Sequence, residues 1–214
     1  MTTLVVWAAV ILALHFLARV PSDASLLSQI LGSLTTVVLI YPPVIIGMLQ
    51  KKTMTYWDYS VPLLKKSFVD FALVSLILFP VSFVVNGFYQ KIIFGAQYHP
   101  AELPHLLIYI GTQIFLIALP EEFFFRGYMQ QNLSEVWPAT KKFLGVPFGR
   151  AQIFTAIIFA LSHSLITVAW WHAFIFFPAL VFGWLREKTG TIWAGVLFHA
   201  ACNVFSYWVR GHYN

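Results

Sequence analysis

The sequence has few charged residues and very few acidic ones. Only 10% of its 214 residues are charged, and eight of them are Asp or Glu, whereas 59% are apolar and 18% are aromatic. The mean hydropathy is +0.77. These values lie outside the range of ordinary soluble domains, so the composition excludes that class and predicts a polytopic membrane protein.

Cysteine pairs, zinc motifs, repeats and linkers are also missing. The single cysteine, Cys202, cannot form an internal disulfide, and no CxxC or HExxH motif is present. No internal repeat or linker rich in Pro, Gly or Ser divides the chain, so we predict one integral membrane domain over residues 1–214. The net charge of +5 resides in short loops, where it indicates orientation, and we expect no nucleic-acid partner.

Seven apolar segments come close to the ~20 residues that cross a bilayer as a helix. They lie near residues 3–20, 25–49, 68–90, 105–130, 151–167, 171–186 and 190–209. No basic residue precedes the first segment and no cleavage site follows it, so we interpret it as a retained helix and not as a signal peptide. The predicted fold is an all-α transmembrane bundle of about seven membrane helices, with an active site in the bundle core.

Basic residues are distributed unequally between the two predicted sides of the membrane. One side carries Lys51, Lys52, Lys65, Lys66, Lys141, Lys142, Arg150, Arg186 and Lys188, and the other carries Arg19, Lys91 and Arg210. Loops rich in Lys and Arg stay in the cytoplasm. We therefore expect a cytoplasmic N-terminus and a prokaryotic plasma membrane.

Two adjacent carboxylates, Glu121 and Glu122, lie inside the apolar stretch 106–129, followed by Arg126. An unpaired carboxylate at membrane depth costs several kcal/mol, so such groups indicate function. Glu122 and Arg126 are four residues apart and can form a charge pair on one helix face. Pro120 frees a backbone carbonyl just before the two carboxylates and predicts a kink.

Polar residues on two later segments are expected to reach the same depth. At about 1.5 Å per residue from the predicted cytoplasmic ends, Glu121, His163, His199 and Asn203 all lie roughly 14–20 Å into the bilayer. This agreement predicts a shared cavity. A carboxylate and an imidazole can deprotonate a water there, while a second imidazole and an amide can stabilise an oxyanion. The remaining histidines have no comparable context; they are His15, His99, His105, His172 and His212.

Three ordered motifs carry a family resemblance. Residues 121–126, EEFFFR, fit the pattern EExxxR, Phe159 to His163 fits FxxxH, and His199 to Asn203 fits HxxxN. The chain resembles the CPBP intramembrane proteases, the family of the type II CAAX prenyl endopeptidases and their bacterial Abi relatives. The resemblance covers about residues 105–209.

The resemblance implies a glutamate-type intramembrane protease that needs no metal or other cofactor. Glu121 with His163 is expected to activate the water, His199 and Asn203 to bind the oxyanion, and Glu122 and Arg126 to support them. The expected partner is a membrane-anchored protein or peptide in the lipid bilayer, prenylated or carrying a sorting tail, that is cleaved near its C-terminus.

Other interpretations stay open at this point. Glu121, His163 and His199 also form the two-His, one-carboxylate set of zinc hydrolases. A non-catalytic binding or immunity protein could retain the motifs for folding, and the Glu122–Arg126 pair can be purely structural. A proton-coupled carrier would require repeats that the chain lacks, and a Cys202 nucleophile would lie in unsuitable apolar surroundings.

Overall fold

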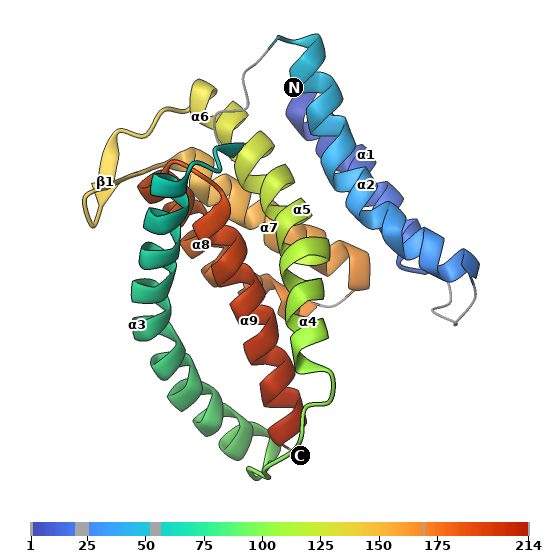
Figure 1. The fold of residues 1–214 in the computed structure, drawn as a ribbon, viewed down its shortest axis with the longest axis vertical. Helices are drawn as coiled ribbons and strands as arrows, with labels where there is room; N and C mark the ends of the chain where they lie inside the picture. Colours follow the sequence, from blue (N-terminus) through green and yellow to red (C-terminus); the bar gives the residue numbers. More distant parts are fainter. Residues whose placement is uncertain (1, 20–25, 52–56, 169, 214) are drawn as a thin grey trace.

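The structure is a computed structural model that describes residues 2–19, 26–51, 57–168 and 170–213. Within these ranges nearly all regular structure is helical, apart from one two-stranded hairpin (Figure 1). The all-α prediction is therefore confirmed. The predicted boundaries at residues 20 and 25 and the basic residue Lys52 lie outside the described residues.

Helices coincide with all seven predicted apolar segments. The elements are α1 (Thr2–Leu17), α2 (Leu26–Leu49), α3 (Val61–Phe94), α4 (Leu106–Thr112), the π-helical η2 (Gln113–Ala118), α5 (Leu119–Glu122), the π-helical η3 (Phe123–Gln130), α6 (Gln131–Val136), β1 (Lys141–Phe143), β2 (Val146–Phe148), α7 (Arg150–Thr167), the 3₁₀ turn η4 (Trp170–Ile175), α8 (Phe176–Thr189) and α9 (Trp193–His212). The third helix starts at residue 61, earlier than predicted, because Pro62 occupies its first turn, where a missing N–H does no harm.

The segment from α4 to α6 is a continuous helix with two π-helical stretches, which flank the short α5 that carries the two carboxylates. Pro120 has no N–H to donate to the carbonyl of Leu116. The hydroxyl of Thr36 on α2 donates to this carbonyl instead, at 3.3 Å. The predicted free carbonyl is therefore used to attach α2 to the helix that carries the carboxylates.

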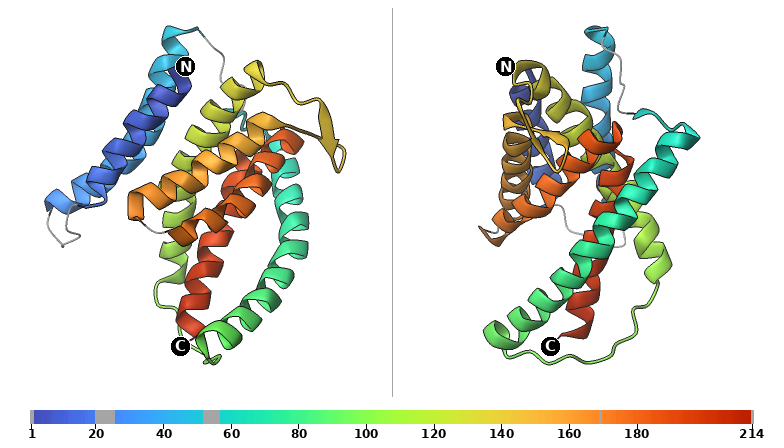
Figure 2. Two further views of the ribbon diagram at one scale, coloured as in Figure 1. Left: turned by 180° about the vertical axis from the view of Figure 1, so that it is seen from behind. Right: turned by 90° about the vertical axis from the view of Figure 1, so that its left-hand side faces the viewer.

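The buried core lies where η3, α7, α8 and α9 meet. Its fully buried aromatic side chains are Phe124, Phe159 and Phe182. The α1–α2 hairpin packs on one side of this core and α3 on the other (Figure 2). On α1, the indole N–H of Trp7 donates to Ser162 Oγ at 2.9 Å, so α1 contacts α7 next to His163.

The outer surface is strongly apolar. On α3, Leu76 and Ile92 are more than 70% exposed, and many other large apolar side chains of the same helix face outward. Contiguous exposed apolar surface of this extent is unfavourable in water and typical of contact with lipid.

Three helices are long and apolar enough to cross a membrane: Val61–Phe94, Leu106–Val136 and Arg150–Thr167. Thr2–Leu17 and Leu34–Leu49 are shorter apolar helices. They indicate an integral membrane protein. The α8 helix has only 14 residues, fewer than the ~20 that span the hydrocarbon. The count of about seven crossings, like the orientation, stays a prediction.

Polar contacts attach the N-terminal half of α3 to the turn between α8 and α9. The Lys188 ammonium lies 2.8 Å from Asp70 Oδ1. The Lys66 ammonium donates to the Lys188 carbonyl at 2.7 Å, near the end of α8 where cations are favoured. Ser67 and Thr191 share a buried hydrogen bond of 3.0 Å.

We expect Asp70→Asn to lower the free energy of unfolding by about 1–3 kcal/mol, because it leaves the Lys188 ammonium without its anionic partner. The measurement is thermal unfolding in detergent, monitored as the fraction of the protein that stays monodisperse. Lys65→Gln is the control, since Lys65 is exposed and makes no ion pair within the described ranges. Equal stability of Asp70→Asn and wild type would show that packing alone holds α3.

Candidate active site

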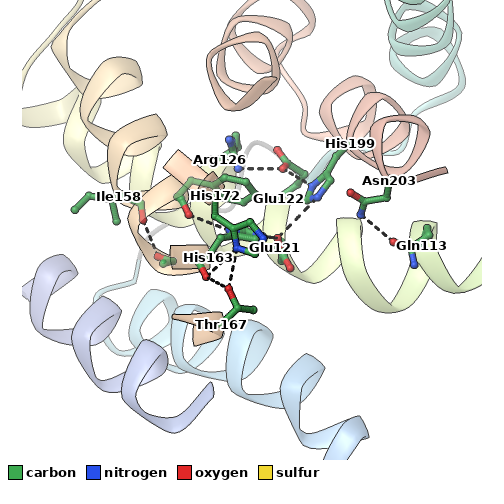
Figure 3. Close-up of polar contacts among 12 residues, drawn as sticks. Gln113, Glu121, Glu122, Arg126, Ile158, His163, Thr167, His172, His199 and Asn203 are labelled. Carbon is green, nitrogen blue, oxygen red and sulfur yellow. Dashed lines mark hydrogen bonds and ion pairs between the residues drawn. The ribbon is translucent and has the colours of Figure 1, made fainter. Parts of the chain in front are cut away.

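The Glu121 carboxylate lies between two imidazoles from other helices. Its Oε2 is 3.5 Å from Nε2 of His163 on α7 and 3.9 Å from Nε2 of His199 on α9 (Figure 3). The structure thus brings together three of the four predicted chemical residues. Glu121 and His163 keep 18% and 26% of their side-chain surface accessible, although the Oε2 atom of Glu121 is itself buried.

The hydrogen bonds of His163 define its tautomer. Its Nδ1 lies 3.0 Å from the carbonyl of Phe159, one turn earlier on α7. A carbonyl only accepts, so Nδ1 carries the hydrogen. The neutral ring therefore presents the lone pair of Nε2 to the Glu121 carboxylate. Two acceptors that face each other in this way require a shared proton or a donating water between them.

Glu122 forms a second, fully buried cluster directly beside the first. Its Oε1 accepts from Arg126 Nη1 and lies 3.0 Å from Nδ1 of His199. Arg126 also donates to the carbonyl of Ala179 at 3.1 Å, and its guanidinium carbon lies 4.2 Å from the centroid of the Phe159 ring. The Glu122–Arg126 pair expected from the spacing is present, and it also engages His199, which the sequence did not indicate.

Aromatic stacking and a close helix approach hold His199 in place. Its ring stacks on Phe182 with centroids 4.8 Å apart and an interplanar angle of 12°. One turn earlier, a Cβ on Gly195 would lie 3.1 Å from Glu122 Oε2. Glycine at this position allows α9 to approach the carboxylate. With Nδ1 at Glu122, the His199 ring directs Nε2 toward Glu121.

Asn203, the fourth predicted chemical residue, lies one turn after His199 and, within the described ranges, makes no hydrogen bond to either carboxylate. Its Nδ2 donates to Oε1 of Gln113 on η2 at 2.8 Å (Figure 3). An amide nitrogen has two hydrogens, so one stays available. Gln113 was not predicted from the sequence. The available signal was a lone amide side chain in an apolar helix, eight residues before Glu121.

His172 also lies closer to the site than its sequence context suggested. Its ring centroid is 6.4 Å from that of His163. The Thr167 hydroxyl donates to the His163 carbonyl and lies 2.8 Å from His172 Nδ1. The chain reverses at Val168, which has a φ of 54°, and this reversal places η4 beside His163. No periodic pattern in the sequence predicts such a turn.

No group of three or more His, Cys, Asp or Glu side chains within the described part of the chain is arranged to hold a metal ion. His199 uses one ring nitrogen for Glu122, which leaves only Nε2 facing Glu121. The zinc interpretation therefore rests on residue types, and a chelator experiment tests it directly.

We expect the two adjacent carboxylates to differ sharply in their effect on stability. Glu122→Gln leaves Arg126 buried without its anion and should lower the free energy of unfolding by about 3–5 kcal/mol. Glu121→Gln has the same change in volume, but the Glu121 Oε2 atom has no hydrogen-bond partner among the described residues. It should therefore change stability by less than about 1 kcal/mol. Thermal unfolding of both variants in detergent measures the difference, and similar losses in both would contradict this division.

Comparison with known proteins identifies a family for part of the chain. Residues 103–205 match the family model described as type II CAAX prenyl endopeptidase Rce1-like, and this range contains every predicted site residue. No curated protein and no solved structure matches the chain. The predicted family is confirmed: over residues 103–205 the chain carries a domain of the type II CAAX prenyl endopeptidase Rce1-like family, which is the CPBP family.

Proposed function

We propose that this protein is an intramembrane endopeptidase in which Glu121 and His163 activate a water for attack on a peptide bond. The observation that supports the proposal best is the pair of facing acceptors, Glu121 Oε2 and His163 Nε2, 3.5 Å apart. A water that donates a hydrogen to either group is polarised by both. Family membership independently favours a CAAX-type protease.

In the proposed reaction, Glu121 and His163 act twice, first as base and then as acid. Glu121 and His163 accept a proton from the water, and the resulting hydroxide attacks the carbonyl carbon. The same pair then returns the proton to the leaving amine as the C–N bond breaks. The oxygen of the scissile carbonyl becomes negative in between and requires hydrogen-bond donors.

His199 and Asn203 supply these donors in our proposal. Two carboxylates and the Arg126 guanidinium leave one negative charge uncompensated, and a protonated His199 neutralises it. Protonated His199 donates from Nδ1 to Glu122 and retains an N–H at Nε2. This N–H faces Glu121 Oε2 at 3.9 Å, beyond hydrogen-bond distance, and donates to no other group among the described residues. Asn203 supplies a second donor, the amide hydrogen that it does not donate to Gln113.

The proposed substrate is a membrane-anchored protein or peptide cleaved near its C-terminus, prenylated or with a sorting tail. The site lies on Leu106–Val136, Arg150–Thr167 and α9, of which the first two are candidate membrane spans, so a substrate held in the bilayer reaches it without leaving the membrane. A non-catalytic binding or immunity protein is the second candidate. The presence of competent residues at all four chemical positions weighs against it.

Cleavage of a C-terminal peptide library tests the proposal. Purified wild type in detergent should cleave farnesylated or unmodified fluorogenic peptides, and Glu121→Gln should lower kcat by about 10²–10⁴-fold, because the general base is lost. The exposed Glu102→Gln serves as the matched control. Activity that disappears in chelator and returns with zinc would establish the metal mechanism instead. A folded wild type that cleaves no peptide would favour the binding protein.

Gln113→Leu should lower kcat about tenfold with KM unchanged, because Gln113 orients the Asn203 amide without contacting the substrate. Asn203→Ala should lower kcat by about 10²–10³-fold. The double variant should be no worse than Asn203→Ala alone, since the two residues act through one hydrogen bond. Thr112→Val is the control because, among the described residues, the Thr112 hydroxyl bonds only to the Ile108 carbonyl of its own helix. Additive losses in the double variant would contradict the positioning role.

A further inference from the structure

An apolar groove lies beneath the β1–β2 hairpin, away from the catalytic cluster. It has a volume of about 480 Å³ and lies between the hairpin, α3 and α8. Every lining side chain is aliphatic or aromatic, including Ile77 of α3, Leu144 and Phe148 of the hairpin, and Val181 and Trp184 of α8. A groove of this size is within the ~300–1,000 Å³ of ligand pockets, and its chemistry suits a hydrocarbon chain.

The tip of the hairpin is exposed and apolar. Phe143 and Leu144 are 57% and 76% exposed. Leu144 has a φ of 50° and Gly145 a φ of 78°, conformations that turns usually fill with Asn, Asp or Gly. An apolar residue in this strained, exposed position favours contact with lipid. The Trp184 indole N–H donates to the Phe143 carbonyl at 3.0 Å and fixes the tip over the groove.

A second pocket of about 640 Å³ adjoins the groove and carries positive charge. Phe148 lines both. Lys141 and Arg150 line the second pocket together with Trp137 and Thr140. In the part of the chain that the structure describes, neither Lys141 nor Arg150 makes an ion pair. These two exposed cations are therefore free to bind an anion.

The groove and the catalytic cluster lie on opposite faces of α8. Phe182 stacks on His199, whereas Leu180 and Trp184 line the groove. Positions two apart on a helix point about 200° apart. An isoprenoid attached near a peptide bond at Glu121 would have to pass around α8 to enter the groove. The geometry therefore favours an occupant other than the substrate.

We propose that the hairpin forms a binding site for an anionic phospholipid. The phosphate lies in the pocket of Lys141 and Arg150, and one acyl chain lies in the apolar groove over Val181 and Trp184. Basic residues beside an apolar surface are the features that select anionic lipids over zwitterionic ones. The bound lipid fastens the hairpin to α3 and α8 without entering the catalytic cluster.

Native mass spectrometry of the full chain, equilibrated in detergent with equal amounts of dioleoyl phosphatidylglycerol and dioleoyl phosphatidylcholine, tests the site. Wild type should retain phosphatidylglycerol in preference. Lys141→Gln combined with Arg150→Gln should reduce this preference by about fivefold for each cation removed. Lys91→Gln is the matched control, because Lys91 is exposed near the far end of α3.

Variants that fill the groove test the contribution of the acyl chain separately from that of the headgroup. Val181→Trp should abolish retention of either lipid, whereas Val85→Trp, on an exposed position of α3 outside the groove, should not. Leu144→Ser gives a second variant that folds, since Leu144 is exposed at the tip, and it should lower retention. Phosphatidylglycerol brominated on its acyl chains should quench the tryptophan fluorescence of wild type more strongly than that of Trp184→Phe.

Three results would overturn the proposal. Equal retention of the two lipids would show that Lys141 and Arg150 do not select an anionic headgroup. Unchanged retention in both Val181→Trp and Leu144→Ser would place the lipid elsewhere. Displacement of phosphatidylglycerol by a farnesylated peptide, but not by the same peptide without farnesyl, would assign the groove to the lipid of the substrate.

Discussion

The buried contact of Glu122 with Arg126 and His199 is the constraint on which the rest of the site depends. A carboxylate and a guanidinium with almost no exposure are tolerated only if each finds partners. Glu122 takes both through one oxygen, while Arg126 adds the Ala179 carbonyl and the face of Phe159. These partners come from η3, α7, α8 and α9. Satisfying one ion pair therefore fixes four elements of the catalytic half relative to one another.

Adjacent carboxylates can have different roles because a helix separates their directions by about 100°. Glu122 is directed into the core between α8 and α9, and Glu121 is directed toward His163 on α7. The Oε1 atom of Glu122 contacts Arg126 and His199, and the Glu122 side chain has no access to solvent, while the Glu121 side chain retains some accessible surface. His199 joins the two, with one ring nitrogen toward each. The His199 imidazole therefore lies between the two carboxylates.

The sequence was sufficient for the helices and for the central contacts of the site. Apolar length predicted the helical segments, and spacing of four predicted the Glu122–Arg126 pair. Depth along each helix predicted that Glu121, His163, His199 and Asn203 share a cavity, and the structure brings the first three together. What it could not provide depends on rotation between helices and on turns. The contact of Asn203 with Gln113 needs the rotation of α9 against η2, and the position of His172 needs the reversal at Val168. The hairpin was missed because strands of three residues leave no periodic signal.

The contact of Trp7 with Ser162 links the family-matched segment to a helix outside it. The segment that matches the family, residues 103–205, contains every residue with a proposed chemical role. Yet α7 is braced by α1 next to His163, the carbonyl freed by Pro120 is satisfied by α2, and α9 is covered by Phe79 of α3. The segment that carries the chemical residues is thus shorter than the part of the chain that holds them in place. A graft of residues 103–205 onto another scaffold would transfer the reacting groups without helices α1, α2 and α3, which support them.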